Sequence, residues 1–182
     1  MSNDDDLKLI NSCLAGNKGA FEELINKYQR TIFNVALRMV NDYDDAEDIS
    51  QTVFIKAYNR LDTFKPKYKF FSWLYRMLIN ESLNFLGKKR QYMQLEQDII
   101  SKDMNPEEKY RKNEFDRNVN KAVGELPVDY RVVIVFRHFA NLSYKELSYV
   151  LDIPIKTVKS RLYTARQILA KIFLDRGIKA YE

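Results

Sequence analysis

Apolar residues recur three and four positions apart along most of this 182-residue chain, and this spacing constrains the fold more than any other feature. Such spacing gathers apolar side chains on one face of an α-helix. Only five Gly and four Pro interrupt the chain, so long helices are favoured over many short strands. We therefore predict an all-α fold. The clearest stripe consists of Phe21, Leu24, Ile25, Tyr28, Ile32, Val35, Ala36 and Met39, and further stripes follow over residues 46–61 and 74–85.

The helical pattern divides into two small domains, over residues 1–92 and 113–182. Residues 93–112 lose clear periodicity and are rich in Gln, Asp, Glu and Lys, so they are predicted to be a flexible linker. A helix could begin at Pro106, because Pro is tolerated in the first turn. The β-branched run at residues 132–136 could also form a buried strand. A helix is favoured there, because no other segment offers a partner strand.

The composition argues against several classes of function. Cys13 is the only cysteine and His138 the only histidine, so we expect no disulfide, no metal site and no cofactor. The chain opens with acidic residues where a signal peptide would be basic, and no apolar run approaches membrane length. These features predict a cytoplasmic protein without membrane insertion.

The C-terminal domain contains the pattern of a helix-turn-helix. Ser143 and Glu146 have the spacing of a capping box, and Asp152-Ile153-Pro154 forms a short turn before a new helix. That helix would bury an arc that runs from Ile155 to Ile172 and present a polar, basic face, as a DNA recognition helix does. Arg161 lies nearer the arc, where an ion pair or a phosphate contact suits it. The residues predicted to contact duplex DNA are Lys156, Thr157, Lys159, Ser160, Tyr163, Thr164 and Arg166. The alternative is a helical hairpin with a solvated face.

Positive charge is concentrated in two blocks. Residues 63–92 carry 7 Lys+Arg against 1 Asp+Glu, and residues 153–182 carry 7 against 2. In the first block, cations alternate with aromatic residues around Tyr68, a pattern that suits single-stranded nucleic acid because bases stack on rings while cations follow the backbone. The alternative is that the rings simply pack in the core. The candidates here are Phe64, Lys65, Lys67, Lys69, Phe70, Phe71, Trp73, Arg76, Asn80, Lys88, Lys89 and Arg90.

Three stretches, residues 44–58, 71–80 and 153–162, resemble the extracytoplasmic-function sigma factors of bacterial RNA polymerase. The resemblance implies that the first domain binds the clamp coiled coil of core polymerase and opens the minus-ten element. The second domain would read duplex minus-thirty-five DNA and meet the polymerase flap, and an anti-sigma partner is usual in the family. Thr164 and Lys156 depart from the family's usual residues at their positions. The residues implied to face the polymerase are Asp45, Glu47, Asp48, Gln51, Phe54 and Ile55.

Several other interpretations remain open from the residues alone. The acids at residues 44–48 also suit a helix N-terminus, where the helix dipole favours negative charge. A repressor or activator with one helix-turn-helix would explain residues 143–172 but not the aromatic and acidic segments. A nuclease or recombinase is disfavoured, because no paired acids are spaced to bind two metals. A helical adaptor would make the charge blocks accidental.

Overall fold

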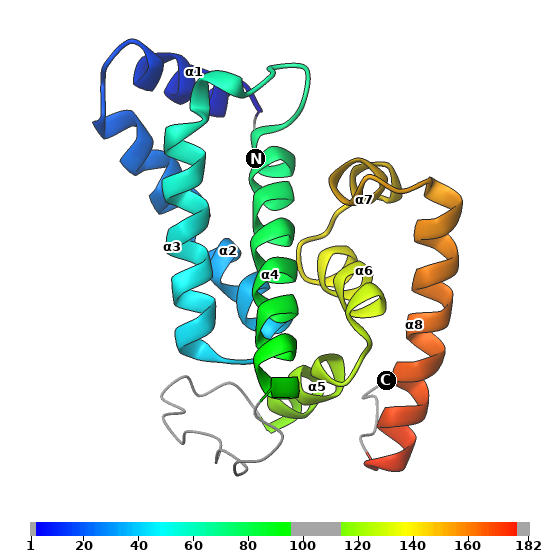
Figure 1. Cartoon of the computed structure of the whole chain (residues 1–182). Coiled ribbons are helices and arrows are strands. Elements are labelled where there is room, and N and C mark those ends of the chain that lie inside the picture. The colour runs from blue at the N-terminus through cyan, green and yellow to red at the C-terminus, as the bar shows by residue number, and fades with distance from the viewer. Residues whose placement is uncertain (1–2, 96–113, 178–182) are drawn as a thin grey trace.

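A computed structural model describes residues 3–95 and 114–177, and within them every regular element is a helix (Figure 1). This confirms the all-α prediction. The N-terminal half contains α1 (Asn3–Leu14), α2 (Gly19–Val40), α3 (Tyr43–Asn59), the short 3-10 helix η1 (Leu61–Thr63) and α4 (Phe70–Leu95). The C-terminal half contains α5 (Glu114–Gly124), α6 (Val128–His138), α7 (Tyr144–Leu151) and α8 (Ile155–Asp175).

In the N-terminal half, α2, α3 and α4 pack alongside one another and α1 crosses one end of the group (Figure 1). The predicted α2 stripe forms its core, and only Ile25 is half-buried. Helix α2 ends because Asn41 adopts a left-handed conformation (φ 57°) and donates its N–H to Leu37 O at 2.8 Å. The chain then re-enters a helix at once, since the Asp42 carboxylate accepts the Asp45 N–H at 3.0 Å.

Helix α6 is the centre of the C-terminal half. It contacts α5, α7 and α8, and also α2 of the other half. All five residues of the β-branched run, 132–136, are buried. A helix that is covered on every side has no polar face to maintain, which explains why this segment reads as continuously apolar without forming a strand.

Local signals in the sequence fix the helix-turn-helix. Ser143 and Glu146 form the predicted capping box at the start of α7, and the preceding Leu142 is buried. Helix α7 ends at Asp152, which is left-handed (φ 54°), and α8 begins after Pro154. One prediction was wrong: Ile155, assigned to the buried apolar arc, lies in the first turn of α8 and is 38% exposed.

The two halves pack against each other in two regions, where α2 meets α5 and α6 and where α4 meets α7. In the first, the Arg131 guanidinium donates hydrogen bonds to Met39 O at the end of α2 (2.6 Å) and to Leu126 O (3.2 Å) and Gly124 O. In the second, α7 lies against the first half of α4, and Tyr75 of α4 also meets Phe136 of α6 edge to face at 5.5 Å. Both chain segments are thereby held in one arrangement, although residues 96–113 between them lie outside the described part.

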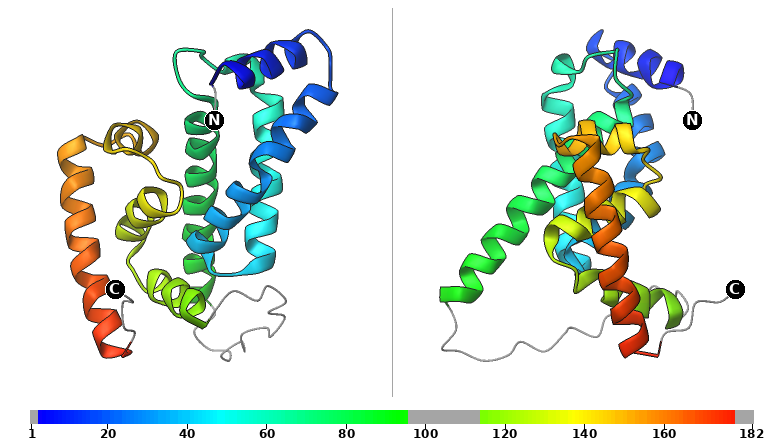
Figure 2. Two further views of the ribbon diagram at one scale, coloured as in Figure 1. Left: turned by 180° about the vertical axis from the view of Figure 1, so that it is seen from behind. Right: turned by 90° about the vertical axis from the view of Figure 1, so that its right-hand side faces the viewer.

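The domain end predicted at residue 92 lies within α4. Helix α4 continues three residues beyond the predicted domain end at residue 92, and its C-terminal end extends away from the other helices (Figure 2, right). The helix predicted from Pro106 and the linker over 93–112 fall largely on residues that are not described. No helix among residues 3–95 and 114–177 combines the length and the apolar character that crossing a bilayer requires.

Candidate nucleic-acid and polymerase interfaces

The outer face of α8 presents the residues predicted to read duplex DNA. Helix α8 lies at the edge of the molecule farthest from α3 (Figure 1). Its face is held outward because Val158, Leu162 and Ala165 are buried against the rest of the domain. Of the predicted set, Thr157 and Thr164 are half-buried and Tyr163 is 67% exposed, while the remaining exposed members are Lys156, Lys159, Ser160 and Arg166.

Two residues beside this face, Arg161 and His138, add little net charge to it. Arg161 makes an ion pair with Asp129 at 3.2 Å, which is one of the two roles that its position near the apolar arc indicated. Partial burial, together with the nearby charges of Arg166 and Arg137, lowers the pKa of His138 below its usual 6.5. His138 is therefore neutral near pH 7 and adds no charge to the α8 face.

The aromatic and basic segment separates into a buried part and an exposed part. Phe64 and Phe70 are buried, and each ring lies 5.6 Å from the ring of Trp73. In this conformation neither Phe64 nor Phe70 is available to stack on a base, so packing accounts for these two rings. Ser72, in the first turn of α4, is also buried. Phe71 and Trp73 are half-buried.

The exposed part of this segment is a surface of cations that follows the loop before α4 and then α4 itself. We call it the strand surface; its described, solvent-reachable members are Lys65, Lys67, Tyr68, Lys69, Arg76, Asn80, Lys88, Lys89 and Arg90. Lys67 lies over the Tyr68 ring at 4.9 Å, and Lys69 over the Phe71 ring at 5.3 Å. Tyr68 was not named among the candidate residues, although the alternating pattern of lysines and rings is centred on it.

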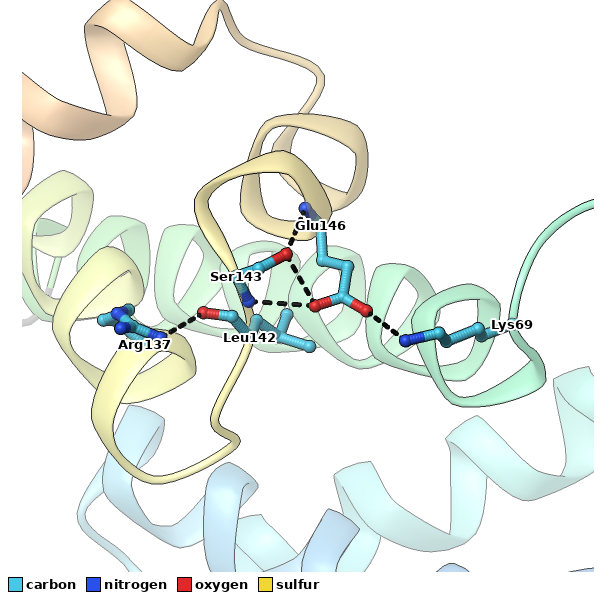
Figure 3. Close-up of polar contacts among 5 residues, drawn as sticks. All are labelled: Lys69, Arg137, Leu142, Ser143 and Glu146. Atoms are coloured by element: carbon cyan, nitrogen blue, oxygen red, sulfur yellow. Dashed lines mark hydrogen bonds and ion pairs between the residues drawn. The ribbon is translucent and has the colours of Figure 1, made fainter. Parts of the chain in front are cut away.

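Helix α7 already contacts the strand surface. The Lys69 Nζ lies 2.9 Å from Glu146 Oε1, while the other Glu146 oxygen accepts the Ser143 N–H and Oγ–H at 2.9 and 2.8 Å (Figure 3). Arg76 lies 3.7 Å from Asp152. Partial burial would raise the pKa of Glu146, but the bonds from Lys69 and Ser143 outweigh it and hold this pKa below its usual 4.5.

Helix α3 presents a third surface, in which acids and apolar side chains are mixed. Glu47, Asp48 and Gln51 are exposed, and Ile55 on the same helix is 61% exposed. Phe54 is half-buried, and Asp45 pairs with Lys89 at 2.7 Å, so these two are less accessible. The sequence did not single out Tyr58, which is 42% exposed one turn beyond Ile55. Exposed apolar residues beside acids are typical of a protein-docking surface.

No metal centre accompanies these surfaces in the described part of the chain, where no three His, Cys, Asp or Glu residues gather as ligands. The arrangement suits binding: one face for a duplex, one for a single strand, and one for a protein.

Comparisons with known proteins match both halves of the chain. Residues 24–92 match the family model Sigma-70 region 2, and residues 116–169 match Sigma-70, region 4. The chain is 33% identical to the RNA polymerase sigma-H factor of Pseudomonas aeruginosa, over 94% of this chain and 95% of that protein. It is 31% identical to the ECF RNA polymerase sigma factor SigW of Bacillus subtilis, over 92% and 96%.

The fold comparison gives the same result. The solved structure of CnrH in complex with the cytosolic domain of CnrY superposes with a TM-score of 0.71 at 24% identity, covering 94% of this chain and 98% of that one. At that identity the match supports the fold alone. Taken with the sequence relatives and the two family models, the chain belongs to the extracytoplasmic-function sigma factors, the factors of bacterial RNA polymerase for promoter-specific transcription initiation.

Proposed function

We propose that this chain directs core RNA polymerase to specific promoters by reading duplex DNA with α8 and gripping a separated strand with the strand surface. The observation that carries the proposal is the presence of both nucleic-acid surfaces on one chain, on separate elements. A repressor that binds only duplex DNA needs the first surface and has no use for the second.

The α8 face accounts for recognition of the minus-thirty-five duplex. A helix of this kind enters the major groove, where Lys can donate to guanine edges and short polar side chains contact bases or phosphates. Lys159, Ser160 and Tyr163 are exposed on this face and are proposed as the principal contacts.

The strand surface accounts for opening of the minus-ten element. Lys65, Lys67 and Lys69 lie in the loop before α4. Lys88, Lys89 and Arg90 lie near the C-terminal end of α4. A single strand laid along this helix would exchange counterions for these cations, and its bases would find the rings of Tyr68, Phe71 and Trp73.

The mixed surface of α3 is proposed to dock on the clamp coiled coil of core polymerase, and the C-terminal domain on the flap. An anti-sigma factor is a further proposed partner; CnrH, the structural neighbour, is itself bound to a second protein. We expect the chain to act in the cytoplasm, where polymerase works. We also propose that it performs no covalent step, because the polymerase carries the chemistry.

Run-off transcription tests the function directly. Core polymerase should start at new, specific sites on a genomic promoter pool when the purified chain is added, and the transcripts would define the promoter. An unchanged pattern of start sites contradicts the proposal. A duplex-only repressor would instead retain its DNA site without polymerase.

Two substitutions test separate surfaces in that assay. Lys159→Ala should weaken promoter recognition by about 1–3 kcal/mol if Lys159 makes a bidentate base contact, and by less if it meets a phosphate. The exposed Lys171, farther along α8, gives the matched control Lys171→Ala.

Asp48→Arg should reduce binding to core polymerase and leave the fold intact, since Asp48 is exposed. Glu23→Arg, at an exposed acid on α2, makes the same change of charge outside the proposed docking surface. Full transcription by Asp48→Arg would remove α3 as the docking face.

A further inference from the structure

Helix α7 contacts the strand surface with the same types of group that a nucleic acid would use. Two carboxylates face two of its cations: Glu146 meets Lys69 at 2.9 Å, and Asp152 meets Arg76 at 3.7 Å. Between these two acids in the sequence stands Tyr149. A single strand likewise presents anionic phosphate oxygens to cations and the rings of its bases to aromatic side chains.

The contact of Tyr149 is the most specific part of this interface. Its ring stacks on Tyr68 with the centroids 4.3 Å apart and the planes inclined by 21°. The Arg76 guanidinium lies over the same ring at 5.6 Å. A stacked base would make both contacts, one with an aromatic face and one with a cation. Tyr149 therefore takes the place that an unstacked base would need.

We propose that α7 masks the part of the strand surface around Tyr68, Lys69 and Arg76 in the free chain, with Glu146 and Asp152 in place of phosphates and Tyr149 in place of a base. The inference rests on the proposed function of that surface. It makes base stacking at Tyr68 and the closed packing of the two halves mutually exclusive. The α8 face stays exposed in the same arrangement, as do Lys65, Lys67 and residues 88–90, so α7 covers only the part of the strand surface around Tyr68.

Two features hold α7 in the masking position. The carboxylate of Glu146 is fixed by the capping box with Ser143, so it faces Lys69 with little freedom left to lose (Figure 3). The contact of Arg131 with Met39 O sets the C-terminal half against α2 independently of α7. Any partner that separates the halves must break both contacts, and the strand surface then becomes free.

The first test uses Tyr149→Ala, which removes the stacked ring without changing the charge. The isolated full-length variant should bind a fluorescently labelled single-stranded oligonucleotide more tightly than the unaltered chain, by anisotropy. The gain can reach roughly tenfold if the closed form holds about nine-tenths of the unaltered molecules, because the apparent affinity scales with the open fraction. Tyr149→Phe keeps the ring and should bind as the unaltered chain does.

A second variant covers the case in which Tyr149→Ala disturbs α7. Asp152→Asn keeps a residue that tolerates the left-handed conformation and removes the acid that faces Arg76. Asp175→Asn, at an exposed acid near the end of α8, removes the same charge elsewhere and serves as the matched control. Asp175→Asn shows how much the loss of one negative charge alone improves single-strand binding. Asp152→Asn should improve single-strand binding by more than that.

The outcomes separate masking from the function on which it rests. Single-strand affinities that are equal among Tyr149→Ala, Tyr149→Phe and the unaltered chain overturn the masking. So does a gain that is equally large for duplex DNA, since the α8 face is exposed throughout. Run-off transcription by the unaltered chain with core polymerase tests the function itself, and failure there leaves the chain without the proposed role whether α7 masks the surface or not.

Discussion

At the scale of single residues, Arg131 links the end of α2 to the end of α5. Arg131 lies in a helical run, and nothing in its spacing distinguishes it from a solvated arginine. In the structure its guanidinium joins carbonyls at the ends of α2 and α5, and burial lowers its pKa. That role depends on which helix ends come together in three dimensions. By contrast, the position of Arg161 on the helix wheel already indicated an ion pair or a phosphate contact, and the structure shows the ion pair.

Replacing Arg131 by lysine should reduce the free energy of unfolding by about 2–4 kcal/mol. A lysine ammonium keeps the charge but cannot hold three carbonyls in the fixed geometry of a guanidinium, so buried acceptors lose their donors. Chemical denaturation measures the loss. The same change at Arg161, whose partner Asp129 is largely exposed, should cost no more than about 1 kcal/mol. If the two substitutions lower the free energy of unfolding equally, the hydrogen bonds of Arg131 do not stabilise the packing of the two halves.

Tyr75 predicts a loss of stability in alkali. Burial raises its pKa from 10 to about 12, because the charged phenolate would be poorly solvated between the two halves. Its contribution is complete below pH 10, where the phenol is protonated in both folded and unfolded chains, and it is lost as the pH rises toward 12. Near pH 11 the loss should be on the order of 1 kcal/mol.

Denaturation of the unaltered chain and of Tyr75→Phe across this range checks the prediction. Tyr28, whose pKa burial and Asp6 also raise, contributes to the alkaline loss in both chains. The difference between the chains therefore isolates Tyr75. Identical pH profiles would mean that the phenol of Tyr75 is solvated in the folded chain.

At the scale of elements, local chemistry predicted more than packing did. The start of α7 and the turn before α8 followed from Ser143, Glu146 and Pro154, because caps and proline act within a few residues. The buried stripe of α2 followed from its spacing for the same reason. The aromatic segment was harder: a ring looks the same in sequence whether it is buried, as Phe70 is, or half-exposed, as Trp73 is.

The capping box of α7 can be separated from its contact with α4. Ser143→Ala removes the cap and should lower the free energy of unfolding by about 1 kcal/mol. Glu146→Gln keeps a side chain that can complete the capping box but loses the ion pair with Lys69, which is partly exposed and contributes little to stability. Denaturation of both variants should therefore show the larger loss for Ser143→Ala. The reverse order would place the stabilising role of Glu146 in the contact with Lys69.

At the scale of the whole molecule, the sequence predicted two helical domains but not their arrangement. Each apolar stripe specifies a face to be buried, and a face can be buried within its own domain without reference to the other. The packing of α7 on α4 depends on a few matched groups, such as Tyr68 with Tyr149 and Lys69 with Glu146, that are 77 or more positions apart in sequence. No pattern of local spacing encodes such a match.

The packing of the C-terminal half on α2 and α4 should persist at high salt. Measuring it at several salt concentrations shows whether ion pairs or aromatic contacts maintain it. The pairs of Lys69 with Glu146 and of Arg76 with Asp152 are partly exposed, so each contributes about 0–1 kcal/mol and weakens as salt screens it. The aromatic contacts of Tyr149 and Tyr75 contribute about 0.5–1.5 kcal/mol each beyond the area they bury, and the hydrogen bonds of Arg131 are partly buried. None of these contacts depends strongly on salt.

The radius of gyration from small-angle X-ray scattering should therefore stay constant between about 0.1 and 1 M salt, across which the Debye length falls from about 10 to about 3 Å. It should rise for Tyr149→Ala at either concentration. An expansion of the unaltered chain with salt would instead assign the closure to the two ion pairs.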